Sequence, residues 1–495
     1  MALIITVLLI MSSVFVSNAA AIEQPYSTAV SETQEISIPK IEITTENGNG
    51  AQLQKADGYV NAEIKITDAD GSALDETVLF KVRGNSTALS GIQKKSFTFK
   101  FDKKKEVLGM GKGKKWALLA NCFDPTLLRN YLVFDFAQEM ELPYTSNQRF
   151  AELWLDGAYR GCYTVYEPVQ EGKDRVDIDI ESNEGKKDFL LEYEATRVED
   201  GVTYITAGGL RFALQEPEEP GEEQTAYVNE VMTDIVNTLK YGSEEDVRQK
   251  IDVDSFAKFY LLNEYAKTND FGLSSVFFFY KDGILYAGPP WDYDLSLGNV
   301  NGELNSASAK AASKSDGILQ DSRNFYRWLC DKEWFTSEVK RFYYKYYPYI
   351  ENISADGGKL DSLREQYADL FARNFKVWDV KRWWLNYQKV PYSTYDENYD
   401  FLKNWCAERN AWLTDYYGII PGAVLIGDAD DNGKVNIDDA AAVQKVLAKF
   451  SVSPFNETAA DIDGDGLSIT DVTLIQRYLA GYENPYQIGE YVKRK

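Results

Sequence analysis

The chain has 495 residues, 44% hydrophobic and 14% aromatic, which is enough for two or three domains with a large core. Its formal net charge of −24 argues against nucleic acid or an anionic membrane surface as a partner. The sequence contains no histidine, which excludes Ser-His-Asp and Cys-His nucleophiles and histidine-ligated metals, so any chemistry depends on carboxylates, Lys, Arg, hydroxyls and bound metal.

The N-terminus carries an apolar run over residues 3–16, too short to span a bilayer comfortably. The small residues at 17–21 suit signal peptidase, so we expect a secretory signal peptide over residues 1–21. A buried or membrane-anchoring helix is the alternative. Residues 22–36 are polar and predict a flexible leader, and no other stretch has transmembrane character.

A β-rich region follows, because apolar and polar residues alternate along it. Asp156-Gly157 predicts a tight turn between two strands. Asp124 and Pro125 predict the start of a helix that ends near Met140. The predicted strands cover residues 41–44, 60–66, 79–82, 97–101, 115–120, 151–155, 162–166 and 190–194.

The second half is predicted to be mostly helical. Asp254 is expected to cap one of its helices. Another helix has an apolar face formed by Tyr227, Val231, Ile235 and Leu239. The fold class is therefore α+β, with a β-rich lobe followed by a helical lobe.

The four cysteines form no CxxC pair, which argues against a cysteine zinc site. They are Cys122, Cys162, Cys330 and Cys406. One or two disulfides, or four small core thiols, both fit the sequence.

Acidic residues stand at both ends of a predicted β-hairpin. Asp270 precedes its first strand, the turn lies at 281–283, and Asp292 and Asp294 follow its second strand. Such a hairpin brings Asp270 and Asp292 near each other. Two carboxylates in a cleft suit a divalent metal, or a base beside a metal.

Two cations of the β-rich half, Arg83 and Lys95, could face these acids and hold phosphate oxygens. The alternative is structural: Asp292 and Asp294 would cap a helix or turn, and Lys95 would be a solvated strand residue. The residues alone leave both interpretations open.

Three motifs together resemble the CotH family of spore-coat kinases: RGNST at 83–87 followed by KKSFTFKF at 94–101, GCYTVYEPV at 161–169, and GPPWDYDLSLG at 288–298. The resemblance covers about residues 38–415. It implies a two-lobed protein-kinase-like fold that holds ATP with Mg²⁺ or Mn²⁺ between the lobes. It also implies an atypical protein kinase that transfers the ATP γ-phosphoryl group to Ser or Thr of a protein.

By this resemblance Asp292 binds metal, Asp270 accepts the substrate hydroxyl proton and Lys95 positions phosphate. The other implied ligands are Arg83, Asn85 and Glu167 for ATP, and Asp294 and Ser275 for the metal. Two departures from typical kinases leave activity open. Ser275 replaces a metal-binding Asn, and Thr268-Asn269 stands where a His precedes the catalytic Asp.

The C-terminal segment contains the same short unit twice, at Asp428–Asp439 and Asp461–Asp471. Each copy has oxygen side chains at alternate positions, a Gly at the sixth, and an acid before an apolar helix, which suits calcium. The expected ligands are Asp428, Asp430, Asn432, Lys434, Asn436 and Asp439, and Asp461, Asp463, Asp465, Ser468 and Asp471. A solvated acidic tail is the alternative, and the duplication argues against it.

Two tandem loop-helix units resemble a type I dockerin, a small all-α module that plugs into cohesin domains of cellulosome-like scaffolds. The resemblance implies Ca²⁺, a cohesin partner and an extracellular, cell-surface complex. The second loop has eleven residues against twelve in the first. The missing residue follows Gly466, where a backbone carbonyl would face calcium, so we expect the second site to be weaker.

The expected organisation is a signal peptide (1–21), a leader (22–36), a CotH kinase-like domain (37–420), a linker (421–427), a dockerin (428–482) and a tail (483–495). A non-catalytic scaffold or carbohydrate-adhesion component docked to a cohesin is the alternative function. Its candidate sugar-stacking residues are Trp378, Trp383, Trp384, Trp405 and Trp412.

Overall fold

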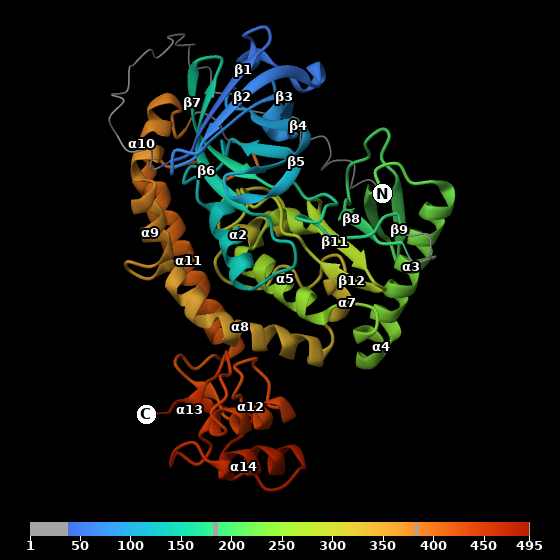
Figure 1. Cartoon of the computed structure of the whole chain (residues 1–495), viewed down its shortest axis with the longest axis vertical. Helices are drawn as coiled ribbons and strands as arrows, with labels where there is room; N and C mark the ends of the chain where they lie inside the picture. The colour runs from blue at the N-terminus through green and yellow to red at the C-terminus, as the bar shows by residue number, and fades with distance from the viewer. Residues whose placement is uncertain (1–37, 182–186, 382–384, 495) are drawn as a thin grey trace.

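The computed structural model describes residues 38–181, 187–381 and 385–494. A β-barrel comes first in the chain, a second sheet and a set of helices follow, and a small C-terminal unit lies beyond them (Figure 1). This order confirms the expected α+β class, with a β-rich N-terminal region and a helical C-terminal region. The predicted signal peptide and leader lie outside the described residues.

In the described part of the chain, the first seven strands close a barrel in the order β1-β2-β3-β4-β5-β7-β6. Strand β1 pairs parallel with β6, and the other neighbours are antiparallel. Apolar residues at alternate positions, such as Ala62, Ile64 and Ile66, point into the barrel core. The strands are β1 (Lys40–Thr45), β2 (Val60–Thr67), β3 (Ala73–Arg83), β4 (Ser96–Val107), β5 (Met110–Leu119), β6 (Gln148–Leu155) and β7 (Ala158–Tyr166).

The predicted turn at Asp156-Gly157 joins β6 to β7, with both residues at positive φ. Short 3₁₀ turns lie in the connections between barrel strands: η1 (Gly50–Gln52), η2 (Lys55–Asp57) and η3 (Ser86–Ala88). The second sheet has the order β12-β11-β8-β10-β9 within the described residues. Its strands are β8 (Phe189–Tyr193), β9 (Tyr204–Ala207), β10 (Leu210–Glu216), β11 (Val276–Lys281) and β12 (Ile284–Ala287).

The helices pack on the second sheet and on one another, around a large aromatic core. On α3, Ile235 and Leu239 are buried and Tyr227 and Val231 pack against that core, which confirms the predicted face. The elements are α2 (Arg129–Glu139), α3 (Glu222–Tyr241), α4 (Glu244–Arg248), α5 (Val253–Ala266), η4 (Asn269–Gly272), α6 (Ala307–Ser313), α7 (Tyr326–Leu329), α8 (Glu333–Ser354), α9 (Lys359–Gln366), α10 (Ala368–Val377) and α11 (Tyr395–Tyr417).

Two predicted helix starts are wrong. Helix α2 begins at Arg129, because the Asp124 carboxylate accepts hydrogen bonds from the backbone of Thr126 and Arg129 and holds the intervening turn. Helix α5 is capped by Asp252, whose side chain accepts the Ser255 N–H, and Asp254 lies inside the first turn. Among the described residues, no helix is both long and apolar enough to cross a membrane.

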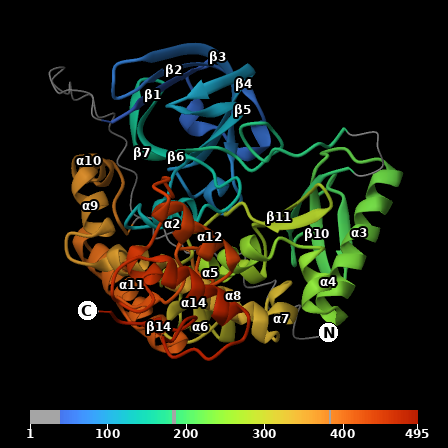
Figure 2. The same ribbon diagram turned by 60° about the horizontal axis from the view of Figure 1, so that its bottom comes forward.

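The C-terminal unit (residues 424–494) has its own small apolar core. It lies against the end of α8 that faces away from the barrel (Figures 1 and 2). Within the predicted dockerin, 428–482, the described elements are all helices, as expected. Outside that range β13 pairs with β14 and so joins the predicted linker to the predicted tail. Its elements are β13 (Val424–Leu425), α12 (Ile437–Leu447), α13 (Glu457–Ala460), α14 (Ile469–Leu479) and β14 (Tyr491–Val492). All four cysteines of the chain, each within the described residues, are free thiols.

Candidate functional site

The structure brings together the two segments that carry the predicted acids. The Asn269 N–H donates to the Leu295 carbonyl at 3.3 Å, and the Leu297 N–H donates to the Ala266 carbonyl at 2.8 Å. The turn η4, which contains Asp270, therefore runs beside the segment that follows Asp292. We call Asp270, Asp292 and Asp294 the acid cluster.

Residues at the start of α2 fix the Asp292–Asp294 segment. The Tyr293 N–H donates to Asn130 Oδ1 at 2.7 Å. Arg129 donates from Nε to the Ser296 carbonyl at 3.1 Å and pairs with Asp124 at 2.6 Å. Both side chains of that pair are 1% exposed, so the anchor is buried and rigid.

A second arginine fixes the turn around Asp270. Arg323 Nη1 donates to the Asn269 carbonyl at 3.2 Å. A Cβ at Gly272 would lie 2.1 Å from that nitrogen, so glycine leaves the space that the guanidinium occupies. Asn324 Nδ2 donates to the Phe271 carbonyl at 3.0 Å on the same side.

Burial raises the pKa of all three carboxyl groups of the acid cluster, and the Asp292 charge adds to the rise at Asp270 and Asp294. Burial first, and the Asp292 charge second, raise the pKa of Asp270 to about 7, against opposing effects of Arg197 and Arg323. Burial raises the pKa of Asp292, and Arg83 opposes that rise. Asp294 is raised well above its ordinary pKa by burial and then by its two acidic neighbours. Carboxylates suit Mg²⁺ or Mn²⁺ in kind, but these three acids are more widely spaced than those of the calcium loops, where three carboxylate oxygens lie within 4.8 Å of one another.

Arg83, at the end of β3, is the predicted cation that reaches the acids. Its guanidinium lies 5.1 Å from the centre of the Trp291 ring. Burial lowers its pKa to about 10, with the Asp292 charge acting in the opposite direction. The barrel therefore presents a half-buried positive charge to the acid cluster.

The other predicted cation, Lys95, points elsewhere. It precedes β4, and its Nζ donates to the Leu53 carbonyl at 2.9 Å and to Gln54 Oε1 at 2.7 Å. Its neighbour Lys94 donates to the carbonyls of Ala120 and Cys162 at 2.7 and 2.8 Å. The structure thus does not bring Lys95 to the acid cluster.

Three further predicted residues have their main contacts with other parts of the chain. Asn85 Oδ1 accepts a hydrogen bond from Lys55 Nζ at 2.8 Å. Glu167 accepts two hydrogen bonds from Asn147 at 2.8 Å and lies 3.8 Å from Arg175. The Ser275 N–H donates to Glu192 Oε1 at 3.0 Å, at the start of β11.

Sequence reasoning missed Arg197, Arg323 and Tyr387. The Tyr387 hydroxyl is 3.0 Å from Ser86 Oγ, so the 385–390 segment contacts the RGNST turn. Burial raises the Tyr387 pKa, and the charges of all three acids of the cluster raise it further. None of the three residues carries a local motif, because each comes from a segment far from the acids in sequence.

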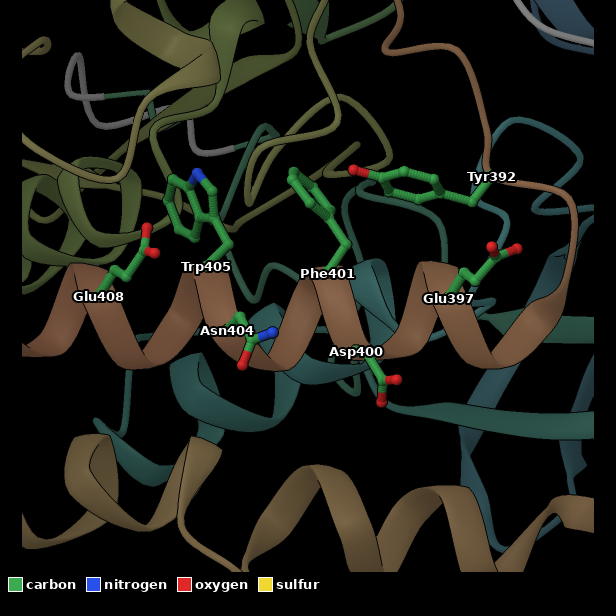
Figure 3. Close-up of a pocket in the computed structure, with 7 residues that line it drawn as sticks. All are labelled: Tyr392, Glu397, Asp400, Phe401, Asn404, Trp405 and Glu408. Atoms are coloured by element: carbon green, nitrogen blue, oxygen red, sulfur yellow. The ribbon is translucent and has the colours of Figure 1, made fainter.

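A separate depression of about 360 Å³ lies on the surface of α11 (Figure 3). Tyr392, Phe401 and Trp405 line it, and Lys389 Nζ lies 3.7 Å from the Tyr392 ring centre. No acid of the acid cluster lines it, so we do not place the chemistry there.

The tryptophans proposed for sugar stacking mostly pack inside the protein. Trp378 and Trp405 are 6% and 4% exposed. Trp412 stacks on Tyr416 with ring centres 5.0 Å apart. Trp383 and Trp384 lie outside the described residues.

Each predicted calcium loop gathers three carboxylates within 4.8 Å of one another. They come from Asp428, Asp430 and Asp439 in the first loop, and from Asp461, Asp463 and Asp471 in the second. Burial raises the pKa of Asp428 to about 7 and of Asp439 to about 6. Carboxylate oxygens gathered this closely are the ligands that calcium takes in proteins, so both loops fit calcium.

The two loops hold their last acid in the same way despite the missing residue. Asp439 accepts the N–H groups of Ala429 and Asn436 at 2.8 and 2.7 Å. Asp471 accepts those of Ile462 and Ser468 at 2.7 and 2.8 Å. The missing residue after Gly466 therefore does not change how the last acid of the loop is held at the start of the helix.

The remaining predicted ligands shape the loops. Asn432 Oδ1 accepts the Lys434 N–H at 2.9 Å. Asn436 and Ser468 are the N-caps of α12 and α14. The Asp465 N–H donates to Asp463 Oδ1 at 3.3 Å.

Comparison with known families agrees with both parts of the structure. A family model described as CotH kinase protein matches residues 80–413. A second model, described as dockerin type I domain, matches residues 426–480. No match to a curated protein was found.

Proposed function

Since the chain belongs to the CotH kinase protein family and carries a C-terminal type I dockerin domain, we propose that it is a secreted, atypical protein kinase of a cellulosome-type complex. The proposed reaction transfers the ATP γ-phosphoryl group to a Ser or Thr hydroxyl of a protein. The observation that supports the proposal is the acid cluster, in which hydrogen bonds hold the Asp270 turn beside the segment after Asp292 and Arg83 of the barrel acts on Asp292.

The proposed two-lobed, kinase-like arrangement assigns each group of the cluster a task. Asp292 and Asp294 hold the metal, and Ser275 is the third proposed ligand. Asp270 orients the attacking hydroxyl and accepts its proton, a role that a pKa of about 7 suits near neutral pH. A Mg²⁺ or Mn²⁺ held by Asp292 and Asp294 would neutralise negative charge on the phosphates.

The cationic side of the proposed site rests mainly on Arg83. A half-buried guanidinium keeps its charge and can donate two hydrogen bonds to phosphate oxygens. The contacts of Lys95, Asn85 and Glu167 indicate that these side chains stabilise the barrel and its turns. To contact ATP, each of the three would have to leave its present partner. Arg197, whose charge acts on both Asp270 and Asp292, is a second candidate cation.

The dockerin implies calcium binding and a cohesin partner, and such domains are typical of extracellular cellulosome components. We propose that residues 1–21 direct secretion, that residues 37–420 form the kinase-like domain and that residues 428–482 form the functional dockerin. The pairing of β13 with β14 extends the folded unit on both sides of that range.

The alternative is a non-catalytic scaffold or carbohydrate-adhesion component held at a cohesin. Two departures from typical kinases favour this alternative: Ser275 stands where they have a metal-binding Asn, and no His precedes Asp270. The burial of Trp378 and Trp405 does not favour sugar stacking at those side chains.

One experiment separates the two functions. The full chain is incubated with γ-labelled ATP and Mg²⁺ or Mn²⁺, and phosphorylated Ser or Thr is sought by mass spectrometry on the chain and on added acceptor proteins. Label that depends on Asp292 supports the kinase. Absence of both labelling and nucleotide-dependent thermal stabilisation favours the scaffold.

A further inference from the structure

The first calcium loop lies against helix α8 of the CotH domain. Arg341 Nη1 donates to the Asn432 carbonyl at 2.8 Å. Lys434 Nζ pairs with Glu338 at 2.9 Å, and the Glu338 side chain is 9% exposed. One turn further along α8, Tyr344 stacks on Tyr491 of β14 with ring centres 3.4 Å apart.

The contact is close enough to require a particular loop residue. A Cβ at Gly433, which has a φ of +81°, would lie 2.7 Å from Arg341 Cγ. Glycine at the sixth loop position thus serves both the calcium turn and the approach of Arg341.

The peptide group that Arg341 holds is also shaped by the first calcium ligand. The Asp428 carboxylate accepts the N–H of Asn432 at 3.0 Å and of Gly433 at 2.8 Å. Asp428 therefore acts on one side of the 432–433 turn and Arg341 on the other. Among the hydrogen bonds and ion pairs of the described residues, no residue of α8 contacts the second loop in this way.

We propose that α8 is a docking surface for the calcium-loaded first loop, so that calcium binding at that loop and docking of the dockerin on the CotH domain reinforce each other. A cation gathers Asp428, Asp430 and Asp439 and sets the turn that Arg341 recognises. Because such coupling is reciprocal, loss of the α8 contact must weaken calcium binding at the first loop and leave the second loop unaffected.

Calorimetric calcium titration of the full chain tests this proposal. Asp461→Ala removes the first ligand of the second loop, so calcium binding to the first loop can be measured alone in that chain. Tyr344→Ala, which changes no charge, is expected to raise its Kd about fivefold or more. Tyr344→Phe retains the ring and is expected to stay within about twofold of the parent, although it loses the hydroxyl contacts to Gly418 and Ile420.

The mirror background provides the control. In a chain with Asp428→Ala, Tyr344→Ala should leave the Kd of the second loop unchanged. Equal weakening at both loops, or no weakening at the first, overturns the proposal. Tyr344→Leu, which keeps apolar bulk on α8 but loses the stack, serves as a second disrupting variant.

Small-angle scattering gives an independent readout on the same proteins. The calcium-loaded wild type should be compact, and the loaded Tyr344→Ala chain should have a larger radius of gyration. Equal radii for the two loaded chains would show that docking does not depend on the α8 contact.

Discussion

The chain holds two kinds of carboxylate cluster, and they differ in what surrounds the acids. Each dockerin loop gathers its three acids from one short segment and holds them with backbone N–H groups. The acid cluster of the CotH domain draws on η4 and on the segment after β12, and arginines from distant segments act on it.

This difference separates two ways to bring carboxylates together. A local loop needs the correct spacing and a glycine, and it can be copied within the chain, as the second loop shows. A site assembled from distant segments needs buried anchors such as Arg129–Asp124. The first kind of cluster should be disrupted by substitution of a single acid. The second kind should also be disrupted by substitution of the residues that anchor its segments.

Substitutions in the acid cluster should have the largest effect. Asp292→Asn removes a metal ligand, so metal-dependent nucleotide binding should weaken together with phosphate transfer. Asp270→Asn should retain nucleotide binding while transfer falls about 10²–10⁴-fold, since it removes the group that positions the hydroxyl. Thermal-shift titration with ATP and Mn²⁺, beside a transfer assay, measures both. Identical defects in the two variants would contradict the separate roles.

The scaffold of the acid cluster is the next target. Arg129→Ala leaves the Asp124 charge buried and unpaired, which should cost about 3–5 kcal/mol of stability in urea unfolding. Lys250→Ala removes an exposed pair with Asp234, at 2.8 Å, and should cost about 0–1 kcal/mol. Calcium affinity should be unchanged in both. A similar small cost for the two variants would mean that the buried anchor is not required.

The two dockerin loops should differ in affinity. The first loop has all twelve positions and the second lacks one, so calorimetry should show a tighter and a weaker calcium site. Asp428→Ala should remove the tighter site, and Asp461→Ala the weaker, each with a loss of roughly tenfold or more. Equal affinities in the wild type would show that the missing residue has no consequence.

The first loop should also bind calcium less tightly as pH falls. Burial raises the pKa of Asp428 to about 7 and of Asp439 to about 6, so protons compete with calcium for these oxygens near neutral pH. Between pH 7.5 and 6.5 the Kd of the first loop should rise about fourfold. A titration in the Asp461→Ala chain measures this, and a pH-independent Kd would contradict the shifted values.

Local patterns in the sequence predicted the local features of this protein. Alternating apolar residues placed the barrel strands, and the spacing of Asp428, Asp430 and Asp439 placed the first loop. The helix start near Asp124 was wrong because the Asp124 carboxylate holds an extra turn before the helix, and the start near Asp254 was wrong because Asp252 is the residue that caps the helix.

Long-range features were outside the reach of the sequence. Nothing near Lys95 indicates that Leu53 and Gln54 accept its hydrogen bonds. Arg197, Arg323 and Tyr387 reach the neighbourhood of the acid cluster through the packing of distant segments. The predicted kinase-like roles of the acids, and the expected nucleotide, stay predictions.

The most direct test of the central claim is nucleotide-dependent Mn²⁺ binding at the acid cluster. Calorimetry on the full chain with Asp428→Ala and Asp461→Ala, which removes the first ligand of each dockerin loop, measures Mn²⁺ with and without ATP. The kinase account predicts one Mn²⁺–ATP site that is lost on adding Asp292→Asn. Mn²⁺ binding that depends neither on ATP nor on Asp292 would contradict the kinase account and favour the non-catalytic scaffold.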